Sequence, residues 1–412
     1  MRSTNFSVRP AVALAILTLI ATGTPATSQQ EKVLHNFKEG GYYGSFPGSS
    51  LILDSRGNLY GTTPIGDIRE GGIVFQLSPK TTGTGWTATT LHAFSGIAGD
   101  GSDPVASLIF DAAGNLYGTT YSSGAYGWGT VFELSPTTGG TWTETILYSF
   151  GNGSDAQHPG SSLILDAAGN LYGTTYSGGT DNLGTVFELS PAAGGDWTET
   201  VLHSFSTGTD GQYPQSAVIL DPAGNLYGTT TLGGAYDIGT VFELSPADNS
   251  WTEKILHSFK PNGHDGGIPF AGLTMDHAGN LYGTTNFGGL HGYGTVFEIG
   301  PASQSEKILH NFSGRPDGEY PYAGLIFDAS GNLYGTTTDG GTAGSGAVFK
   351  MTPTTPTGTG WTETVLHSFG AGNSTDGSFP DAAVVFDALG NLYGTTTYGG
   401  TYNDGTVFAI RP

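Results

Sequence analysis

A seven-residue string, Gly-Asn-Leu-Tyr-Gly-Thr-Thr, recurs seven times along the 412-residue chain. The copies begin at Gly57, Gly114, Gly169, Gly224, Gly279, Gly331 and Gly390, so successive copies lie 57, 55, 55, 55, 52 and 59 residues apart. Repetition at a near-constant period indicates one supersecondary unit that buries its apolar face against neighbouring copies. Seven such units account for nearly the whole chain and leave no room for a separate catalytic domain.

Each unit contains four apolar runs of strand length. In the second unit these are residues 107–111, 115–120, 129–135 and 142–150, which we call runs a, b, c and d. Runs of this length that are bounded by Gly, Pro, Asn and Asp predict antiparallel strands joined by turns. Each unit therefore predicts a four-stranded sheet.

The two ends of the repeat array complement each other. A d-type run at residues 31–37 precedes the first a run, and the last unit ends on a c-type run at residues 405–411. The N-terminal run can complete the last unit, which closes the array and removes its free sheet edges. We therefore predict an all-β fold, a seven-bladed β-propeller of four-stranded antiparallel blades, closed by an N-terminal d strand.

An aspartate stands three residues before the first glycine of every copy. The seven are Asp54, Asp111, Asp166, Asp221, Asp276, Asp328 and Asp387. An Asp side chain accepts hydrogen bonds from nearby backbone N–H groups, and the Gly supplies a positive φ, so the pattern predicts the a–b turn. Seven acids in a ring also suggest calcium. Because every blade needs the turn, whereas a ligand rarely needs seven identical sites, we predict the turn role.

The repeat unit has a recognisable signature. It consists of L-I-x-D-x-x-G-N-L-Y-G-T-T, a following G-G, G-T-V-F-E-L-S-P and L-H-S-F, and it recurs through residues 31–412. This signature resembles the GloVer-type tandem-repeat family of exported bacterial proteins. The resemblance implies a propeller in an extracytoplasmic setting and implies no particular activity.

The N-terminus predicts export. Arg2 and Arg9 flank the start of an 11-residue apolar run at residues 11–21, which is too short to span a membrane. Small residues at Ala26 and Ser28 predict cleavage before Gln29. We expect residues 1–28 to be a secretory signal peptide and residues 29–412 to be one propeller domain. The mature protein is then a monomer that is secreted, periplasmic or part of the cell envelope, with no membrane insertion.

Charge and composition exclude several functions. The formal net charge is −22, and removing residues 1–28 makes it 11 − 35 = −24. Nucleic-acid binding needs a basic surface, so we expect no nucleic-acid partner. The chain has no cysteine, which excludes thiol catalysis, disulfides and cysteine-type zinc sites.

Histidines and aspartates repeat near run d. Six histidines share one position in this run, and a tyrosine takes it in the remaining copy: His35, His92, Tyr148, His203, His257, His310 and His367. Alternation places them on the same face as the Trp and Phe of the run, and we expect them to pack between blades. The d–a loops carry Asp100, Asp155, Asp210, Asp265, Asp317 and Asp376. We predict turn formation by these acids; Ca²⁺ is the weaker alternative, and no cofactor or metal ligand is predicted.

The b–c loops differ most between units and supply the candidate ligand-binding residues. These are Tyr126, Trp128, Asp181, Asn182, Tyr236, Asp237, His291, Tyr293, Tyr402 and Asp404. Aromatic rings stack on the C–H faces of sugars, while carboxylates and amides bind hydroxyl groups. The same composition is also typical of plain turns.

These observations favour a non-enzymatic binding or scaffold protein that recognises a polysaccharide or a protein partner through its b–c and d–a loops. Two alternatives stay open. One is a carbohydrate-active enzyme, a polysaccharide lyase or glycoside hydrolase, with its site at the channel mouth. The other is a purely structural component of the cell envelope. No catalytic residue is predicted, because no nucleophile, phosphate-binding or dinucleotide motif occurs in its required context.

Overall fold

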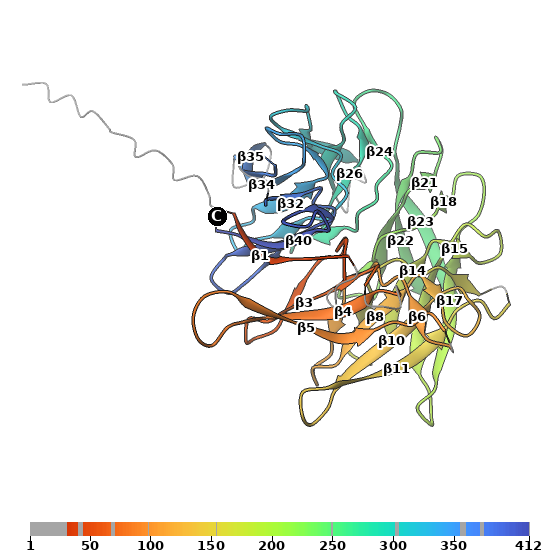
Figure 1. The fold of residues 1–412 in the computed structure, drawn as a ribbon. Coiled ribbons are helices and arrows are strands. Elements are labelled where there is room, and N and C mark those ends of the chain that lie inside the picture. The colour runs from red at the N-terminus through yellow and green to blue at the C-terminus, as the bar shows by residue number, and fades with distance from the viewer. Residues whose placement is uncertain are drawn as a thin grey trace, which may run out of the picture.

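The computed structural model describes residues 31–39, 44–66, 71–97, 99–153, 155–248, 250–300, 305–354, 360–370 and 375–411. The proposed signal peptide at residues 1–28 lies outside these ranges. The described chain forms seven four-stranded antiparallel sheets, one for each repeat, in the strand order a-b-c-d. This confirms the predicted seven-bladed propeller (Figure 1). Within these residues, no helix is long and apolar enough to cross a membrane.

Each of the first four blades takes its four strands from a single repeat. Blade 1 has β2 (Ile52–Leu53), β3 (Leu59–Thr63), β4 (Ile73–Pro79) and β5 (Trp86–Ala93), and blade 2 has β7 (Ile109–Phe110), β8 (Leu116–Thr120), β10 (Thr130–Pro136) and β11 (Trp142–Ser149). Blade 3 has β13 (Ile164–Leu165), β14 (Leu171–Thr175), β16 (Thr185–Pro191) and β17 (Trp197–Ser204), and blade 4 has β19 (Ile219–Leu220), β20 (Leu226–Thr230), β22 (Thr240–Ala247) and β23 (Ser250–Ser258).

Blades 5 and 6 have the same arrangement, and blade 7 closes the ring. Blade 5 has β25 (Thr274–Met275), β26 (Leu281–Thr285), β28 (Thr295–Ile299) and β29 (Glu306–Asn311), and blade 6 has β31 (Ile326–Phe327), β32 (Leu333–Thr337), β34 (Ala347–Pro353) and β35 (Trp361–Ser368). Blade 7 combines β37 (Val385–Phe386), β38 (Leu392–Thr396) and β40 (Thr406–Ile410) with β1 (Lys32–Asn36). Figure 1 shows β1, in red, beside β40, in blue, and this pairing confirms the predicted closure.

Two-stranded ribbons join the d–a and b–c loops in six of the repeats. They are β6 (Gly101–Ser102) with β9 (Ser122–Ser123), β12 (Ala156–Gln157) with β15 (Ser177–Gly178), β18 (Gly211–Gln212) with β21 (Leu232–Gly233), β24 (Gly266–Gly267) with β27 (Phe287–Gly288), β30 (Gly318–Glu319) with β33 (Asp339–Gly340), and β36 (Gly377–Ser378) with β39 (Tyr398–Gly399). These ribbons place both loop sets on one face of the ring, which is the face where the sequence predicts a ligand.

The repeated aspartates form the a–b turns, as predicted. In blade 2, Asp111 Oδ1 accepts hydrogen bonds from the backbone N–H groups of Ala113 and Asn115, at 2.9 and 2.8 Å. Its Oδ2 accepts a hydrogen bond from the Asn115 side-chain amide at 2.8 Å and one from the Tyr117 hydroxyl at 3.3 Å. Burial alone would raise the pKa of Asp111, but these hydrogen bonds outweigh it and lower the pKa. The carboxylate therefore serves the turn.

The glycine in the middle of the string makes room for a phenylalanine. Gly118 pairs with Phe132 across β8 and β10, and a Cβ on Gly118 would lie 2.6 Å from Phe132 Cζ. The Phe132 ring then meets Phe94 of the preceding blade edge-to-face, with the ring centroids 5.1 Å apart. Seven such interblade pairs, at 5.0–5.4 Å, run around the ring: Phe37–Phe75, Phe94–Phe132, Phe150–Phe187, Phe205–Phe242, Phe259–Phe297, Phe312–Phe349 and Phe369–Phe408.

The first threonine of the string ties each blade to the next. Thr119 Oγ1 donates to the carbonyl oxygen of Ser161, at 3.2 Å, and Thr395 closes the circle by donating to Ser49 at 3.0 Å. The same bond occurs at all seven junctions. A buried hydroxyl must find a partner, so these bonds fix the angle between blades as well as their contact.

A β-bulge in every d strand corrects one prediction. Phe132 pairs with Ile146 and Val131 pairs with Tyr148, so Leu147 is an extra residue. The bulge turns the two halves of the strand to opposite faces. Trp142 contacts Tyr60 of the preceding blade, whereas Phe150 contacts Phe187 of the following blade. The repeated histidine position does pack between blades, but on the face opposite to the Trp.

We predict that Gly118→Ala destabilises the protein by about 1–3 kcal/mol, the usual cost of overpacking a core. The added methyl group must displace the Phe132 ring and with it the contact to Phe94. Gly48→Ala is the matched control, because its Cβ would meet only Thr397 Oγ1, at 4.0 Å. Chemical denaturation of both variants measures the difference. Equal stability of the two variants would contradict the packing role of Gly118.

Candidate functional site

A cavity of about 810 Å³ lies at the centre of the ring, where all seven blades meet. Its lining residues are Phe46, Gly48, Pro64, Val105, Tyr121, Gly160, Tyr176, Pro214, Gln215, Phe270, Tyr322, Thr338, Asp381 and Thr397. Most of them occupy one of two positions in the repeat. The first follows the proline that precedes each a strand, and the second follows the Thr-Thr that ends each b strand.

These two positions differ between repeats, although their surroundings are nearly identical. The position after the proline holds Gly48, Val105, Gly160, Gln215, Phe270, Tyr322 and Asp381 in blades 1 to 7. The position after Thr-Thr holds Pro64, Tyr121, Tyr176, Thr231, Asn286, Thr338 and Thr397. The cavity wall therefore breaks the sevenfold symmetry of the scaffold.

One part of the wall is aromatic. Phe270 and Tyr322, from neighbouring blades, stack with their ring centroids 4.5 Å apart and the planes 20° from parallel. Tyr121 stacks on His158 at 4.5 Å, and Tyr176 stacks on Tyr213 at 5.0 Å. Burial and the neighbouring Tyr176 both raise the pKa of Tyr121. The ring planes are thus held in place before any ligand arrives.

Asp381 supplies a carboxylate to the same cavity. It accepts hydrogen bonds from Thr397 Oγ1 at 2.7 Å and from Thr338 Oγ1 at 2.8 Å. Burial raises the pKa of Asp381 against the effect of these two bonds, and Asp339 raises it further. Asp381 is the one carboxylate among the described residues of the lining. Two-carboxylate glycoside hydrolysis would need a second acid at a fixed separation.

The cavity wall is anchored by the residues that come directly before the proline preceding each a strand. They have positive φ values of 55–58° although none is glycine: Phe46, Asp103, His158, Tyr213, Ile268, Tyr320 and Phe379. In each, the N–H donates to a b–c loop carbonyl of the preceding blade, as His158 does to Trp128 at 2.9 Å. In blades 2 to 7 its carbonyl oxygen accepts a hydrogen bond from a backbone N–H of its own blade, as that of His158 does from Tyr176 at 3.0 Å. In blade 1 the corresponding donor position is Pro64, which has no N–H. A conformation this costly persists only where the structure enforces it.

The ten residues predicted from the sequence lie further out, on the b–c loops. Tyr126, Trp128, Tyr236 and Tyr402 expose 40–51% of their surface. Asp181 and His291 are also exposed. None of the ten is among the described residues that line the central cavity.

The other predicted residues have partners within the loops. Asn182 and Asp237 adopt positive φ, and their Oδ1 atoms accept from the backbone N–H groups of Gly178 and Gly233, at 2.9 and 3.3 Å. Asp404 accepts from the Glu39 N–H at 2.8 Å. Tyr293 contacts Tyr320 and Trp128 contacts His158, each edge-to-face. The rim therefore consists of separate hairpins rather than one constellation.

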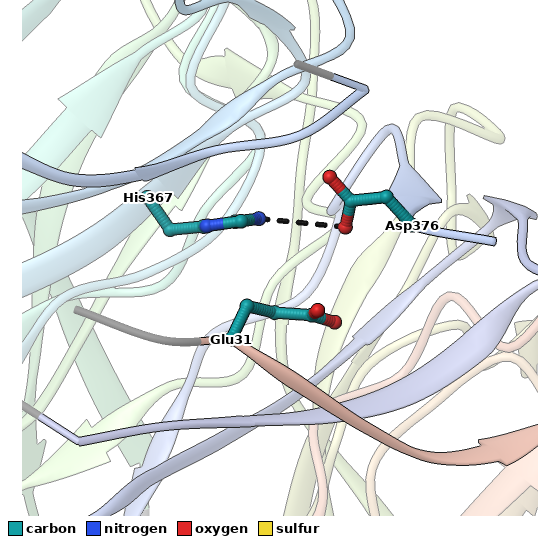
Figure 2. Close-up of side chains that lie close together, drawn as sticks. All are labelled: Glu31, His367 and Asp376. Atoms are coloured by element: carbon teal, nitrogen blue, oxygen red, sulfur yellow. Dashed lines mark hydrogen bonds and ion pairs between the residues drawn. The ribbon is translucent and has the colours of Figure 1, made fainter. Parts of the chain in front are cut away.

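A second kind of site lies between the blades. In the part of the chain that the structure describes, five junctions bring together the repeated histidine of one d strand, the aspartate of the following loop and a glutamate of the next d strand. The triads are His92–Asp100–Glu144, His203–Asp210–Glu253, His257–Asp265–Glu306, His310–Asp317–Glu363 and His367–Asp376–Glu31. Figure 2 shows the last triad, in which Glu31 comes from the closing N-terminal segment. The ligand atoms of each triad lie within 4.8 Å of one another, so these groups could hold a metal ion.

Burial makes the junction glutamates unusual. It raises the pKa of Glu144, Glu253 and Glu363 to about 7, and that of Glu306 to about 9. Asp100 behaves oppositely: burial alone would raise its pKa, but the nearby His92 imidazole and the hydrogen bonds from Ser95 outweigh burial and lower the pKa. The d–a loop aspartates do form turns, as predicted, but they also face histidines.

Both sites contain residues that the sequence analysis missed. The glutamates share the Trp-Thr-Glu segment of run d, and their alternation with Trp was a signal of a buried face. The wall residues occupy two positions whose residue type differs between repeats, one after the invariant Thr-Thr and one after the invariant Pro. Both signals lie in a position-by-position comparison of the repeats.

The junction that carries Tyr148 provides a pH-dependent prediction. Glu199 accepts the Tyr148 hydroxyl at 3.1 Å, and burial raises the pKa of Glu199 from 4.5 to about 7. Between these values the folded state keeps a proton that the unfolded state has lost. Glu199 therefore favours folding below about pH 4.5, and this contribution disappears as the pH rises through 7.

We expect Glu199→Gln to gain stability relative to the wild type as the pH rises from about 5 to about 8, because glutamine stays neutral. Thermal midpoints of both proteins across this range test the expectation. Asp181→Asn, at an exposed loop tip, is the control and should show no such trend. A pH-independent difference for Glu199→Gln would count against a buried ionisable carboxylate.

Solved structures with a related fold are distant. A putative 6-phosphogluconolactonase from Bacteroides uniformis ATCC 8492 is 13% identical, covers 76% of this chain and 83% of its own, and has a TM-score of 0.48. A putative oxidoreductase (glucose dehydrogenase) from Thermus thermophilus is 14% identical, covers 93% and 100%, and has a TM-score of 0.46. Similarity at this level carries no argument about activity.

The sequence comparison concerns the repeat itself. No curated protein matches the chain. The model of the Gloeobacter/Verrucomicrobia repeat matches residues 19–218, 72–281, 140–326 and 217–412, which overlap and together run from residue 19 to the C-terminus. This confirms the resemblance carried by the sequence signature. The chain belongs to the Gloeobacter/Verrucomicrobia repeat family.

Proposed function

We propose that the protein is a non-enzymatic, exported carbohydrate-binding propeller that holds a segment of a neutral polysaccharide in its central cavity. One observation carries this proposal: the two positions that differ between repeats converge on one cavity and supply it with aromatic rings beside a desolvated carboxylate. A cavity of about 810 Å³ falls in the range of known ligand pockets.

The aromatic part of the wall suits sugar rings. Tyr121, Tyr176 and the stacked Phe270–Tyr322 pair offer ring faces that are fixed by their neighbours. Stacking on preorganised rings costs little conformational entropy. Asp381 and Gln215 supply polar groups for hydroxyls, and Gln215 is itself held by a 3.2 Å bond from its Nε2 to Thr231 Oγ1.

The outer rim extends the same surface. We propose that the exposed Tyr126, Trp128, Tyr236 and Tyr402 contact further sugar units of a long chain, together with the polar Asp181 and His291. These contacts are secondary, because the rim side chains are separate and half exposed. A protein partner on the same face is the competing interpretation of the exposed aromatics.

Affinity electrophoresis tests the proposal. The protein is run through gels that contain plant, algal or bacterial polysaccharides, with and without Ca²⁺. We expect retardation in at least one gel without loss of polymer. A cleared track would make the protein an enzyme, and unretarded migration in every gel would overturn carbohydrate binding in favour of a protein partner or a structural role.

Two variants locate the site. Tyr176→Ala removes one cavity ring, and we expect it to weaken binding about tenfold, since a stacked aromatic contributes about 1 kcal/mol or more. The matched control, Trp128→Ala with Tyr126→Ala, removes two rim rings and should weaken binding about threefold or less. Thermal midpoints verify folding. Loss of binding in the rim variant, with Tyr176→Ala unaffected, would contradict the cavity as the principal site.

A further inference from the structure

At each of the five His–Asp–Glu junctions, one glutamate oxygen has no hydrogen-bond partner among the residues that the structure describes. These atoms are the Oε1 atoms of Glu31, Glu144, Glu253, Glu306 and Glu363, and all five are buried. The Glu306 side chain is only 9% exposed. A buried carboxylate oxygen without a partner is costly, and each such atom in a native structure requires a physical explanation. Its recurrence at five equivalent places indicates that something positively charged belongs there.

The donor atoms at each junction fit a metal ion. His Nε2 lies 3.4 Å from Asp210 and 3.8 Å from Glu253 at His203, and 3.2 Å from Asp265 and 3.7 Å from Glu306 at His257. Ligands of a tetrahedral Zn²⁺ site, bound at about 2.0–2.1 Å, lie about 3.3 Å from one another. Small adjustments of these side chains would bring three donors onto one ion.

We propose that each of the five junctions binds one divalent transition-metal ion of the Zn²⁺ class, which clamps two neighbouring blades together. One imidazole nitrogen with two carboxylates is a ligand set of borderline softness, typical of zinc and its neighbours. Calcium prefers six to eight oxygen ligands, and the described residues of these junctions do not present that number. Each divalent ion would balance the two negative charges of its Asp and Glu ligands, so the buried cluster would be neutral.

The aspartates are already oriented for this role. The Oδ2 atom of Asp210 accepts from the Ser206 N–H at 2.8 Å, and that of Asp376 accepts from the Gly370 N–H at 2.8 Å. The d–a turns make the same bond at Asp100, Asp265 and Asp317. Outer-shell hydrogen bonds of this kind fix the direction of a metal-binding carboxylate. Figure 2 shows the resulting arrangement at His367, with the Asp376 carboxylate facing the imidazole and the Glu31 side chain beside the pair.

The other two junctions lack the ligand set, which makes the number of sites a prediction. Where Tyr148 replaces histidine, its hydroxyl oxygen lies 3.1 Å from both Asp155 Oδ2 and Glu199 Oε2 and shares its one proton between them, and the Ala156 N–H donates to Glu199 Oε1. This glutamate is satisfied without an ion. At the junction of blades 7 and 1, Ala88 stands where the other d strands have glutamate. Five sites are therefore expected, not seven.

A shared proton is the competing way to neutralise these clusters. Asp265 and Glu306 approach closely enough for a carboxyl–carboxylate hydrogen bond, which contributes to the raised pKa of Glu306. The proton-sharing and metal-binding explanations predict different effects of replacing a junction glutamate by glutamine. Gln mimics a protonated Glu and would preserve a proton-sharing junction, whereas it removes a charged ligand from a metal site.

Metal counting decides between them. Untagged purified protein is dialysed at neutral pH against Zn²⁺, with a parallel sample in Ca²⁺, and the bound metal is measured by atomic emission. We expect five tightly held zinc ions per chain, four in Glu144→Gln and five in the matched control Glu199→Gln. Tyr148→His completes a triad with Asp155 and Glu199 and should raise the count to six.

Thermal denaturation provides a second measurement. Zn²⁺ should raise the midpoint of the wild type, and raise it less in Glu144→Gln, while Ca²⁺ should have little effect. The proposal is overturned if Glu144→Gln binds as much zinc as the wild type, or if Ca²⁺ binds at the same sites equally well. If Tyr148→His does not fold, the comparison of Glu144→Gln with Glu199→Gln decides alone.

Discussion

The edge-to-face contact between two phenylalanines, one from each of two neighbouring blades, is the interaction on which the rest of the structure depends. The ring of the c strand, such as Phe132, lies over a glycine of its own sheet and against Phe94 of the preceding blade. A closed ring requires every junction to have the same geometry. A change in the angle between two blades must therefore be compensated at the other junctions for the ring to close. This requirement explains why the repeated string tolerates so little change, since its Gly, Tyr and first Thr all serve the contact between blades.

A scaffold built in this way leaves few positions free to carry function. Repeated residues form turns, core and junctions, whereas the residues beside the axis change from blade to blade without disturbing the contact. They place aromatic rings and Asp381 in one cavity, where a single asymmetric ligand can bind. The junction triads have the opposite character. They are repeated, buried and equivalent, and this suits a structural ion in a chain that has no disulfide.

Much of the fold could be predicted from the sequence, because strand number and the complementary ends determine a closed seven-bladed ring. The turn role of Asp111 and the interblade position of His92 also followed from local patterns. The bulge at Leu147 could not be seen by counting alternation, because one extra residue reverses the face of everything after it. For that reason Glu144 and His92, far apart in the sequence and on apparently similar faces, were not expected to meet. The predicted rim residues, such as Tyr126, lie on the predicted face. The cavity wall at Tyr176 and Asp381 is formed by residues next to the ends of inner strands of different blades, and only closure of the ring brings these residues together.

We propose that ligand binding resides at the axis, where the repeats differ, and hydrogen–deuterium exchange is the direct test. The exchange of the full chain is compared with and without the polysaccharide that retards it most. We expect protection of the wall segments beside the cavity, near Tyr121, Tyr176 and Tyr322, with little change at the b–c loop tips. Protection confined to the tips near Tyr126, Tyr236 and Tyr402, with the wall segments unaltered, would contradict it.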